Sequence, residues 1–241
     1  MVLPPSPDPT LSPVPPAPIP TPRQVLPESV RGVNMDRLPT DRKIVALTFD
    51  AGAGAQGIPS ILNTLSLERV PGTFFLTGKW VEAYPDLARR IAAVQINSIA
   101  NHTYDHPYLT KKTDAQVDYE IEHARTLIQE ATGRDTRPLF RFPYGDRNAR
   151  LLARVNALDY ASILWTVDTL GWEGKSRGVT VQTVHDRVMA HLQPGEIILM
   201  HVGASEDGST LDADALRGVI ASIRAQGYDF VAIWDFIYGQ A

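Results

Sequence analysis

The chain has 241 residues, of which 44% are hydrophobic and 21% charged, and this balance suits a globular protein with a substantial core. A formal net charge of −4 gives no reason to expect nucleic acid or an acidic membrane surface as a partner. The sequence contains no cysteine, which excludes disulfides and a cysteine nucleophile. No apolar run approaches the ~20 residues that span a bilayer, so we predict no membrane span in this chain.

The N-terminal segment is rich in proline: residues 1–30 hold eleven of the nineteen prolines. Proline fixes φ and removes a backbone donor, so residues 1–32 are predicted to form an irregular, extended linker. The segment lacks the basic start and apolar centre of a signal peptide. We expect an export signal or a lipid anchor upstream of Met1, and therefore an extracellular or cell-surface protein. The alternatives are a ligand for a proline-recognising module and a plain tail.

Residues 33–241 alternate between strand-like and helix-like segments, which predicts one α/β domain built on parallel strands. Apolar, β-branched runs predict strands at 44–50, 73–77, 96–100, 138–142, 160–166, 196–202 and 229–233. Apolar residues at helical spacing predict helices at 57–70, 80–94, 113–132, 149–157, 181–192 and 213–225. There is no Gly-x-Gly-x-x-Gly turn and no Walker-type loop, so a barrel is favoured over a nucleotide-binding sheet.

A carboxylate ends the first long apolar run. Asp50 follows Ile44 to Phe49 and leads into a loop of Gly and Ala. Burying an acid at a strand end is costly unless the acid has a partner or a task. The carboxyl ends of parallel strands are where such folds place their chemistry, so we interpret Asp50 as a candidate catalytic residue. The alternative is an Asp that merely starts a turn.

Two histidines follow the run at 96–100. His102 and His106 are four residues apart and could converge on a divalent metal, with zinc the default for histidine ligands. Thr103 and Asp105 lie between them and could orient the rings. Pro107 disfavours a helical His106, so we expect a turn there. Two surface histidines in a polar loop are the alternative.

Further polar and aromatic residues follow the later strands. Arg141 near a buried strand end needs an anion, which Asp50 could supply. The Pro and Gly that flank Tyr144 predict a stiff turn, able to aim a backbone N–H at a substrate oxygen. Trp172 suits stacking against a sugar ring, with a core aromatic as the alternative. His201 at a barrel mouth could act as a general acid or base.

Trp165 and the remaining three histidines are predicted to have no role in the site. Trp165 is expected to be a core aromatic residue. His123, His185 and His191 fall on predicted helices as solvated or partly packed side chains.

Five motifs, in their order along the chain, resemble those of the polysaccharide deacetylases, the NodB-homology or family 4 carbohydrate esterases. They are Thr48-Phe49-Asp50, His102-Thr103-Tyr104-Asp105-His106, Arg141-Phe142-Pro143-Tyr144-Gly145, the loop from Asp168 to Trp172, and Leu199-Met200-His201. The resemblance covers residues 33–241 and implies a distorted (β/α)7 TIM-like barrel of the NodB type. It also implies metal-dependent hydrolysis of a linear amide C–N bond, which removes acetyl groups from N-acetylated sugars of a polysaccharide such as peptidoglycan or chitin. Some members of the family instead hydrolyse O-acetyl esters.

The same resemblance assigns a role to each matched residue. It implies Asp50 as general base, His102 and His106 as metal ligands, Arg141 as the residue that orients the base, Tyr144 as an oxyanion-hole N–H, Trp172 as an aromatic wall, Leu199 as part of the acetyl pocket, and His201 as general acid. The implied partner is a polysaccharide, and the sequence carries no signal for oligomeric state.

Two positions depart from the family pattern. Ala51 stands where the family has a metal-binding carboxylate, and Gly171 stands where it has an Asp that tunes the catalytic histidine. Three hypotheses follow from Ala51: Asp50 binds the metal itself, or waters complete the metal's shell, or the metal is lost and the domain only binds glycans. For Gly171, we interpret Asp168 as a candidate substitute partner for His201. The alternative to an enzyme is therefore a catalytically impaired carbohydrate-binding domain on the same barrel.

Overall fold

The structure is a computed structural model, and it describes residues 25–204 and 206–239. Most of the predicted proline-rich linker, residues 1–24, lies outside the described ranges. Within them, Leu26 and Val30 are already buried in the core, so the packed part of the chain begins before residue 33. The boundary of the domain at residue 33 stays a prediction.

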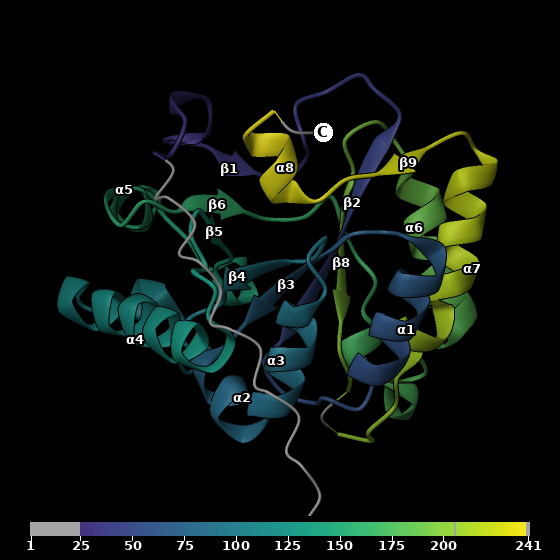
Figure 1. Ribbon diagram of the computed structural model, residues 1–241, viewed down its shortest axis with the longest axis horizontal. Coiled ribbons are helices and arrows are strands. Elements are labelled where there is room, and N and C mark those ends of the chain that lie inside the picture. Colours follow the sequence, from purple (N-terminus) through teal and green to yellow (C-terminus); the bar gives the residue numbers. More distant parts are fainter. Residues whose placement is uncertain (1–24, 205, 240–241) are drawn as a thin grey trace, which may run out of the picture.

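A curled sheet of parallel strands forms the centre of the molecule (Figure 1). Its strands are β1 (Asn34–Met35), β2 (Ile44–Ala51), β3 (Gly72–Leu76), β4 (Ser98–Asn101), β5 (Leu139–Phe140), β6 (Ala161–Ile163), β7 (Val167–Asp168), β8 (Ile197–His201) and β9 (Asp229–Phe230). They lie in the order β1-β6-β5-β4-β3-β2-β8-β7, and β9 pairs with the start of β2. This arrangement confirms the predicted distorted (β/α) barrel.

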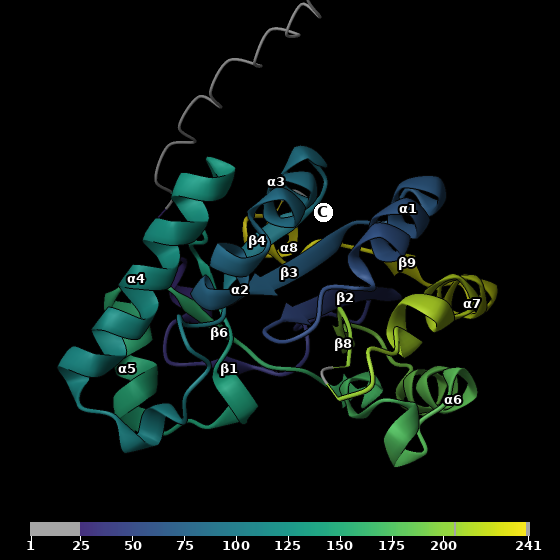
Figure 2. The ribbon, with the colours of Figure 1, turned by 90° about the horizontal axis from the view of Figure 1, so that it is seen from below.

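The helices surround this sheet, as the view from below shows (Figure 2). They are α1 (Ile58–Glu68), α2 (Gly78–Ala83), α3 (Pro85–Ala93), α4 (Asp114–Thr132), α5 (Ala149–Ala157), α6 (Val181–His191), α7 (Leu211–Ala225) and α8 (Ile233–Ile237). Short 3-10 helices lie at Glu28–Val30, Leu109–Lys111, Pro143–Gly145, Gly171–Glu173 and Lys175–Arg177. No helix in the described ranges is both long enough and apolar enough to cross a bilayer.

Several predicted elements differ in their details. The helix expected at 80–94 is two helices, because Tyr84 leaves the helical region (φ −133°, ψ 53°) and Pro85 starts α3. The strand expected at 160–166 is only β6, and the missed strand β7 follows it. The strand expected at 229–233 ends at Phe230, and the missed helix α8 begins at Ile233. The two-residue strand β1 was also missed, because so short a strand has no period to detect.

Strand alternation divides the core into an outer and an inner layer. Along β2, Leu47, Phe49 and Ala51 pack in the outer cluster with the buried faces of the helices. Ala46, on the opposite face, belongs to an inner cluster that also holds Phe75. Burying a side chain of the size of Leu or Phe contributes ~1.5–3 kcal/mol, so this double coverage accounts for a strand that is buried at all eight positions.

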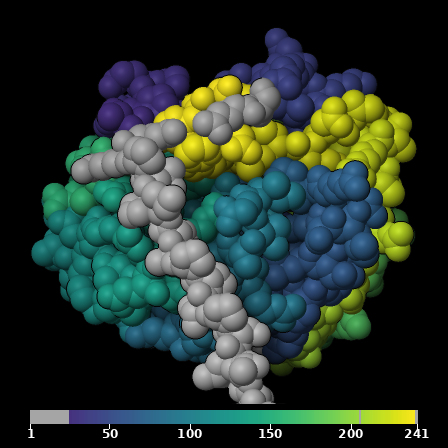
Figure 3. All heavy atoms as spheres, viewed as in Figure 1, coloured from purple at the N-terminus to yellow at the C-terminus, as the bar shows by residue number. Residues whose placement is uncertain are grey.

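The amino-terminal ends of the strands are closed by the two ends of the described chain. Leu26, Val30 and Ile233 are buried in the inner cluster beside Ile44, the first residue of β2. Figure 3 shows the first described residues, in purple, next to the yellow C-terminal segment that carries α8. The carboxyl ends of the strands lie at the other end of the sheet, which is where the polar residues gather.

Candidate active site

The register between β2 and β8 places the first pair of site residues. Asp50 is paired with His201, and Thr48 with Leu199. Since side chains alternate along a strand, Thr48 and Asp50 point away from the outer cluster that takes Leu47 and Phe49. Asp50, Leu199 and His201 therefore face the inside of the barrel at its carboxyl end.

Arg141 lies directly beyond β5 and is fully buried. Its Nη1 donates to Asp50 Oδ1 at 2.6 Å, and its Nη2 donates to Thr48 Oγ1 and to the carbonyl of Leu164, both at 3.0 Å. The guanidinium carbon lies 3.9 Å from the centre of the Phe75 ring. A planar cation held on so many sides fixes the carboxylate of Asp50 in one orientation.

The charge state of Asp50 follows from its neighbours. Burial by itself raises the pKa of this carboxyl, but the charge of Arg141, which is the largest opposing influence, and its hydrogen bond to Asp50 help to hold the pKa below its usual value. Asp50 is therefore ionised at neutral pH and able to accept a proton.

His102 and His106 meet at the end of β4. Their Nε2 atoms lie 3.1 Å apart, and His102 Nε2 lies 3.3 Å from Asp50 Oδ2. His102 Nδ1 lies 2.9 Å from the carbonyl of Arg141, which can only accept, so Nδ1 carries the hydrogen and Nε2 presents a lone pair. Burial, helped by the neighbouring His102, lowers the pKa of His106 to about 3, so this ring is neutral.

The loop from residue 102 to 106 is held by residues that sequence reasoning missed. Glu120 of α4 is buried, and its Oε2 accepts hydrogen bonds from the backbone N–H groups of Tyr104 (3.1 Å) and Asp105 (2.9 Å). Thr103 Oγ1 accepts from the backbone N–H of His106 at 3.0 Å, and His106 has φ +55° in a turn, as Pro107 led us to expect. In the sequence, Glu120 lies three residues after Val117 and next to Ile121, on the apolar face of the predicted helix. A carboxylate at such a position is the signal that could have revealed this support.

The expectation that Thr103 and Asp105 orient the histidine rings is wrong. Thr103 holds the backbone of His106 instead of a ring. Asp105 forms an ion pair with Lys79 at 2.5 Å, on the outside of the loop.

Within the described ranges, no three His, Cys, Asp or Glu side chains are arranged as a ready-made metal site. The donor chemistry nevertheless fits a cation. With its hydrogen on Nδ1, His102 turns the lone pair of Nε2 toward Asp50 Oδ2, so two electron-rich atoms lie 3.3 Å apart with no hydrogen between them. His106 Nε2 completes a set of neutral imidazole nitrogens and one carboxylate oxygen that suits zinc or a similar divalent ion.

Ala51, the residue that replaces the expected carboxylate, is fully buried in the outer cluster. It lies on the face of β2 that packs against the helices, whereas Asp50 lies on the face that meets His102. The donor set of the described site therefore rests on Asp50 and the two histidines.

Tyr144 occupies the stiff turn that its flanking residues predicted. It has φ +58°, and Gly145 follows with φ +65°. The Tyr144 ring stacks on Tyr108 (centres 4.2 Å apart) and meets the edge of His106 at 4.5 Å. In the described part of the chain the backbone N–H of Tyr144 donates to no protein acceptor, which leaves it available to a ligand oxygen.

His201 faces two carboxylates. Its Nδ1 lies 3.7 Å from Asp212 Oδ2 and 4.0 Å from Asp168 Oδ1. Burial lowers the pKa of His201, but Asp212, Asp168 and Asp50 outweigh burial and raise it above its ordinary value. Asp212, in the first turn of α7, was missed by sequence reasoning, although a carboxylate eleven residues after His201 was visible.

Trp172 and Trp165 have different surroundings. Trp172 is 41% exposed, with its ring centre 6.3 Å from that of His201, so it can form a wall of the mouth. Trp165 is only partly buried: it packs against the edge of the inner cluster, with its ring 5.7 Å from the Arg141 guanidinium, so the expected core position holds only in part. The other three histidines lie on the outer helices: His123 on α4, and His185 and His191 on α6.

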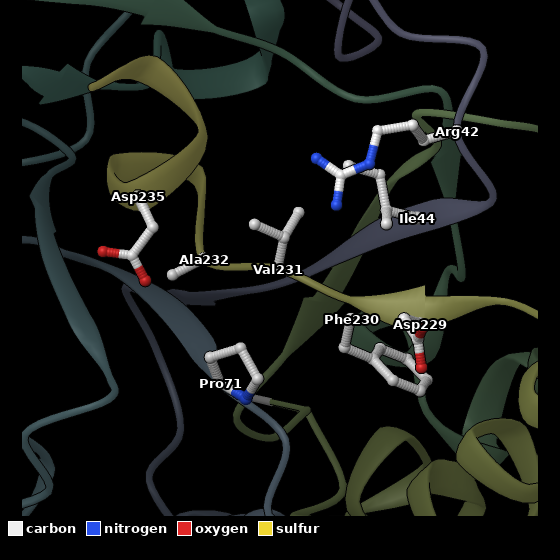
Figure 4. Close-up of a pocket in the computed structure, with 8 residues that line it drawn as sticks. All are labelled: Arg42, Ile44, Pro71, Asp229, Phe230, Val231, Ala232 and Asp235. Atoms are coloured by element: carbon white, nitrogen blue, oxygen red, sulfur yellow. The ribbon is translucent and has the colours of Figure 1, made fainter. Parts of the chain in front are cut away.

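A separate pocket of about 190 Å³ lies at the opposite end of β2 (Figure 4). Ile44, Pro71 and Val231 line it, with Arg42 and Asp235 at its edges. Because Ile44 and Asp50 are at opposite ends of the same strand, this pocket is distinct from the candidate site.

Comparison with known proteins agrees with this geometry. The sequence profile of the family described as polysaccharide deacetylase matches residues 37–163, which is more than half of the chain. The chain belongs to the polysaccharide deacetylase family. The resemblance to the polysaccharide deacetylases, and the enzyme family that it predicted, are thereby confirmed.

Individual members of the polysaccharide deacetylase family cover most of the chain. It is 30% identical over 200 residues to the peptidoglycan-N-acetylmuramic acid deacetylase PdaA of Bacillus subtilis (strain 168), covering 83% of this chain and 73% of that protein. It is 32% identical over 197 residues to the peptidoglycan-N-acetylglucosamine deacetylase of Bacillus cereus (strain ATCC 14579), covering 81% and 68%. Among solved structures, the family 4 pseudoenzyme BA3943 from Bacillus anthracis aligns with a TM-score of 0.79 and 27% identity, over 87% of this chain and 70% of that one.

Proposed function

We propose that this polysaccharide deacetylase is a metal-dependent hydrolase that removes acetyl groups from N-acetylated sugars of a cell-wall peptidoglycan or chitin-like polymer. The observation that carries the proposal is the pairing of Asp50 with His201 across β2 and β8. Arg141 holds Asp50 ionised, and the pKa of His201 is raised above its ordinary value. A base and an acid at one strand edge are what amide hydrolysis requires, and a glycan-binding domain has no need of them.

Asp50, acting as the base, takes a proton from the attacking water, and Arg141 keeps the carboxylate in place. The Tyr144 N–H donates to the oxyanion that develops on the acetyl group. His201, protonated at the start, gives its proton to the leaving amine as the C–N bond breaks. Trp172 and Leu199 would form the wall and floor beside the acetyl group.

His102, His106 and Asp50 would hold the divalent metal, with zinc as the default ion. When bound, such an ion polarises the acetyl carbonyl and makes a coordinated water more acidic. Burial lowers the pKa of both histidines, which gives the neutral rings that a metal needs, and the Arg141 carbonyl holds His102 in the tautomer that frees Nε2.

The test measures two properties of the full chain purified without chelator: its metal content, and the acetate it releases from N-acetylglucosamine oligomers and from peptidoglycan. We expect bound divalent metal and acetate release, with a fall of ~100-fold or more in Asp50→Asn and in His102→Ala. Asp214→Asn, an exposed carboxylate on α7, is the control and should behave as wild type.

The alternative is a catalytically impaired carbohydrate-binding domain, which Ala51 favours. Metal-free, inactive wild type that gains both metal and activity in Ala51→Asp would support the alternative and contradict the deacetylase. The pseudoenzyme BA3943 makes the comparison direct, since a mutant of that protein is described as having restored enzymatic activity.

We also propose that the protein is extracellular or on the cell surface. The proline-rich residues 1–30 suit a spacer, and the relatives named above act on peptidoglycan, a wall polymer. Locating the tagged full-length protein in cell fractions tests this, and a purely cytoplasmic signal would contradict it.

A further inference from the structure

We propose that Asp212 is the positioning residue of His201, and that Gly171 is a glycine in order to make room for it. This inference rests on the proposed function for the role of His201 as the acid. The contact itself rests on four observations made on the described residues.

First, Asp212 reaches His201 from a different element. It lies in the first turn of α7, only 2% exposed, and its Oδ2 accepts a hydrogen bond from the backbone N–H of His201 at 2.7 Å. That bond holds the carboxylate beside the imidazole.

Second, the imidazole and the carboxylate each have one unpaired atom. Among the described residues, His201 Nδ1 and Asp212 Oδ1 are both buried without a hydrogen-bond partner. Nδ1 lies 3.7 Å from Asp212 Oδ2, so a small ring rotation closes an N–H···O bond. Buried polar atoms rarely remain unpaired, and catalytic hydrogen bonds are often long before substrate binds.

Third, the competing carboxylate of Asp168 is the more distant and the more exposed of the two. Asp168 Oδ1 lies 4.0 Å from Nδ1 and accepts a hydrogen bond from the Leu170 N–H at 2.8 Å. The side chain of Asp168 is 20% exposed, against 1% for that of Asp212. Each carboxylate already accepts one backbone N–H, so the closer and more deeply buried Asp212 is the stronger partner for the imidazole N–H.

Fourth, the space around Asp212 is shaped by position 171. A Cβ placed on Gly171 would lie 2.3 Å from Asp212 Oδ2 and 2.4 Å from its Cγ and Oδ1. The carboxylate of Asp212 thus fills the space that any side chain at position 171 would enter. The two positions are coupled: a side chain at 171 and a carboxylate at 212 exclude each other.

The chemical consequence concerns the tautomer of His201. A carboxylate on Nδ1 holds the hydrogen there when the ring is neutral and aims Nε2 at the reacting group. Asp212 touches neither substrate nor water in this scheme, and acts only through His201.

The first test compares two substitutions that keep the shape of the side chain. Asp212→Asn retains an acceptor for the His201 backbone N–H but loses the negative charge. We expect kcat for acetate release to fall ~10–100-fold, with KM within about twofold of wild type. Asp168→Asn should change kcat by less than about threefold, and Asp214→Asn, in the same turn of α7, should change nothing.

The second test exchanges the two positions. Asp212→Gly removes the carboxylate, and adding Gly171→Asp to it returns a carboxylate from the other side. We expect the double variant to recover ~10-fold or more of the lost kcat, whereas Gly171→Asp alone should destabilise the fold. A stable, fully active Gly171→Asp variant would contradict the proposed coupling.

The third test does not depend on activity. Nitrogen chemical shifts of the neutral His201 ring, assigned with His201→Gln, report which nitrogen carries the hydrogen. We expect Nδ1–H in wild type and a shift toward Nε2–H in Asp212→Asn. If Asp212→Asn leaves the tautomer unchanged and Asp168→Asn alters it, the proposal is wrong. Inactive wild type with the expected tautomer change would overturn the deacetylase function and leave the Asp212–His201 pair standing.

Discussion

Asp50 and Arg141 are joined by a 2.6 Å hydrogen bond, although 91 residues separate them in the chain. Both side chains are almost completely buried, at 8% and 0% exposed. A buried ion pair of this kind stabilises the fold less than its geometry suggests, because both charges lose their water. The ion pair instead fixes the orientation of Asp50. Removing Arg141 therefore leaves a buried carboxylate without its cation, and the cost can be measured.

Arg141→Met tests the pair through stability. The variant leaves Asp50 buried without its cation, so we expect the free energy of unfolding to fall by ~3–5 kcal/mol at neutral pH. The measurement is urea unfolding in the presence of a chelator. The double variant Arg141→Met with Asp50→Asn should recover part of the loss, since no charge then remains unpaired. A single variant within about 0.5 kcal/mol of wild type would refute the argument.

Glu120→Ala tests the support of the loop from residue 102 to 106, which we propose binds the metal. Without the carboxylate that accepts from Tyr104 and Asp105, the loop that carries His106 loses its anchor on α4. We expect zinc affinity, measured by calorimetry, to fall ~10–100-fold, with activity falling in parallel. Glu122→Ala is the matched control, because Glu122 lies on the same helix and pairs with Arg125. Equal affinities in the two variants would show that the anchor is dispensable.

Trp172→Ala tests the aromatic wall. A half-exposed ring beside His201 should stack on the sugar, an interaction worth ~1 kcal/mol. We expect KM for N-acetylglucosamine oligomers to rise ~5–10-fold, with kcat within about twofold. Trp172→Phe keeps a stacking surface and should recover most of the loss. An unchanged KM in the alanine variant would remove Trp172 from the binding surface.

Glu196→Gln tests a buried acid that lies directly before β8, at the end of the strand opposite to His201. Burial raises the pKa of Glu196 to about 8, against a weaker opposing hydrogen bond from the Gln193 N–H. The folded state thus binds this proton more tightly than the unfolded state, so stability is greatest below the unfolded pKa and falls as pH rises toward 8. The loss is on the order of a few kcal/mol.

The measurement for Glu196→Gln is the melting temperature at pH 5 and pH 9. Wild type should lose more stability than the variant between these values, because glutamine has no proton to release. Glu130→Gln, an exposed residue of α4, is the control and should follow wild type. The same pH dependence in Glu196→Gln as in wild type would mean that Glu196 does not titrate in this range.

The sequence determined the class of fold through local patterns. The run before Asp50 is apolar at nearly every position, without polar alternation, which predicts a strand that is buried on both faces. The structure buries β2 at all eight positions. α5 begins and ends at the predicted residues, and α4 at nearly the predicted ones, because caps are local signals: Thr113 and Gln116 form a capping box, and Gly133 ends the helix with φ +72°. β1, β7 and α8 carry no comparable signal, since they are too short for a period to show.

The sequence by itself also determined the family, because five motifs in a fixed order resemble those of the polysaccharide deacetylases and the family profile matches residues 37–163. Only the tertiary structure decided how the residues of these motifs meet. The register of β2 with β8 turns Asp50 and His201 to one side, and it leaves Ala51 in the packing against the helices. Register, and contacts between elements far apart in the chain, depend on packing that no local pattern encodes.

The surroundings of His201 show this most clearly. In the sequence, Gly171 stands where the family has a carboxylate, and Asp168 is the nearest substitute along the chain. In three dimensions the carboxylate of Asp212, 41 positions from Gly171 in the printed sequence, occupies the space beside Gly171 and binds the backbone of His201. Steric exclusion between two segments is a property of the folded chain, so only the tertiary structure could reveal that the glycine and the aspartate belong together.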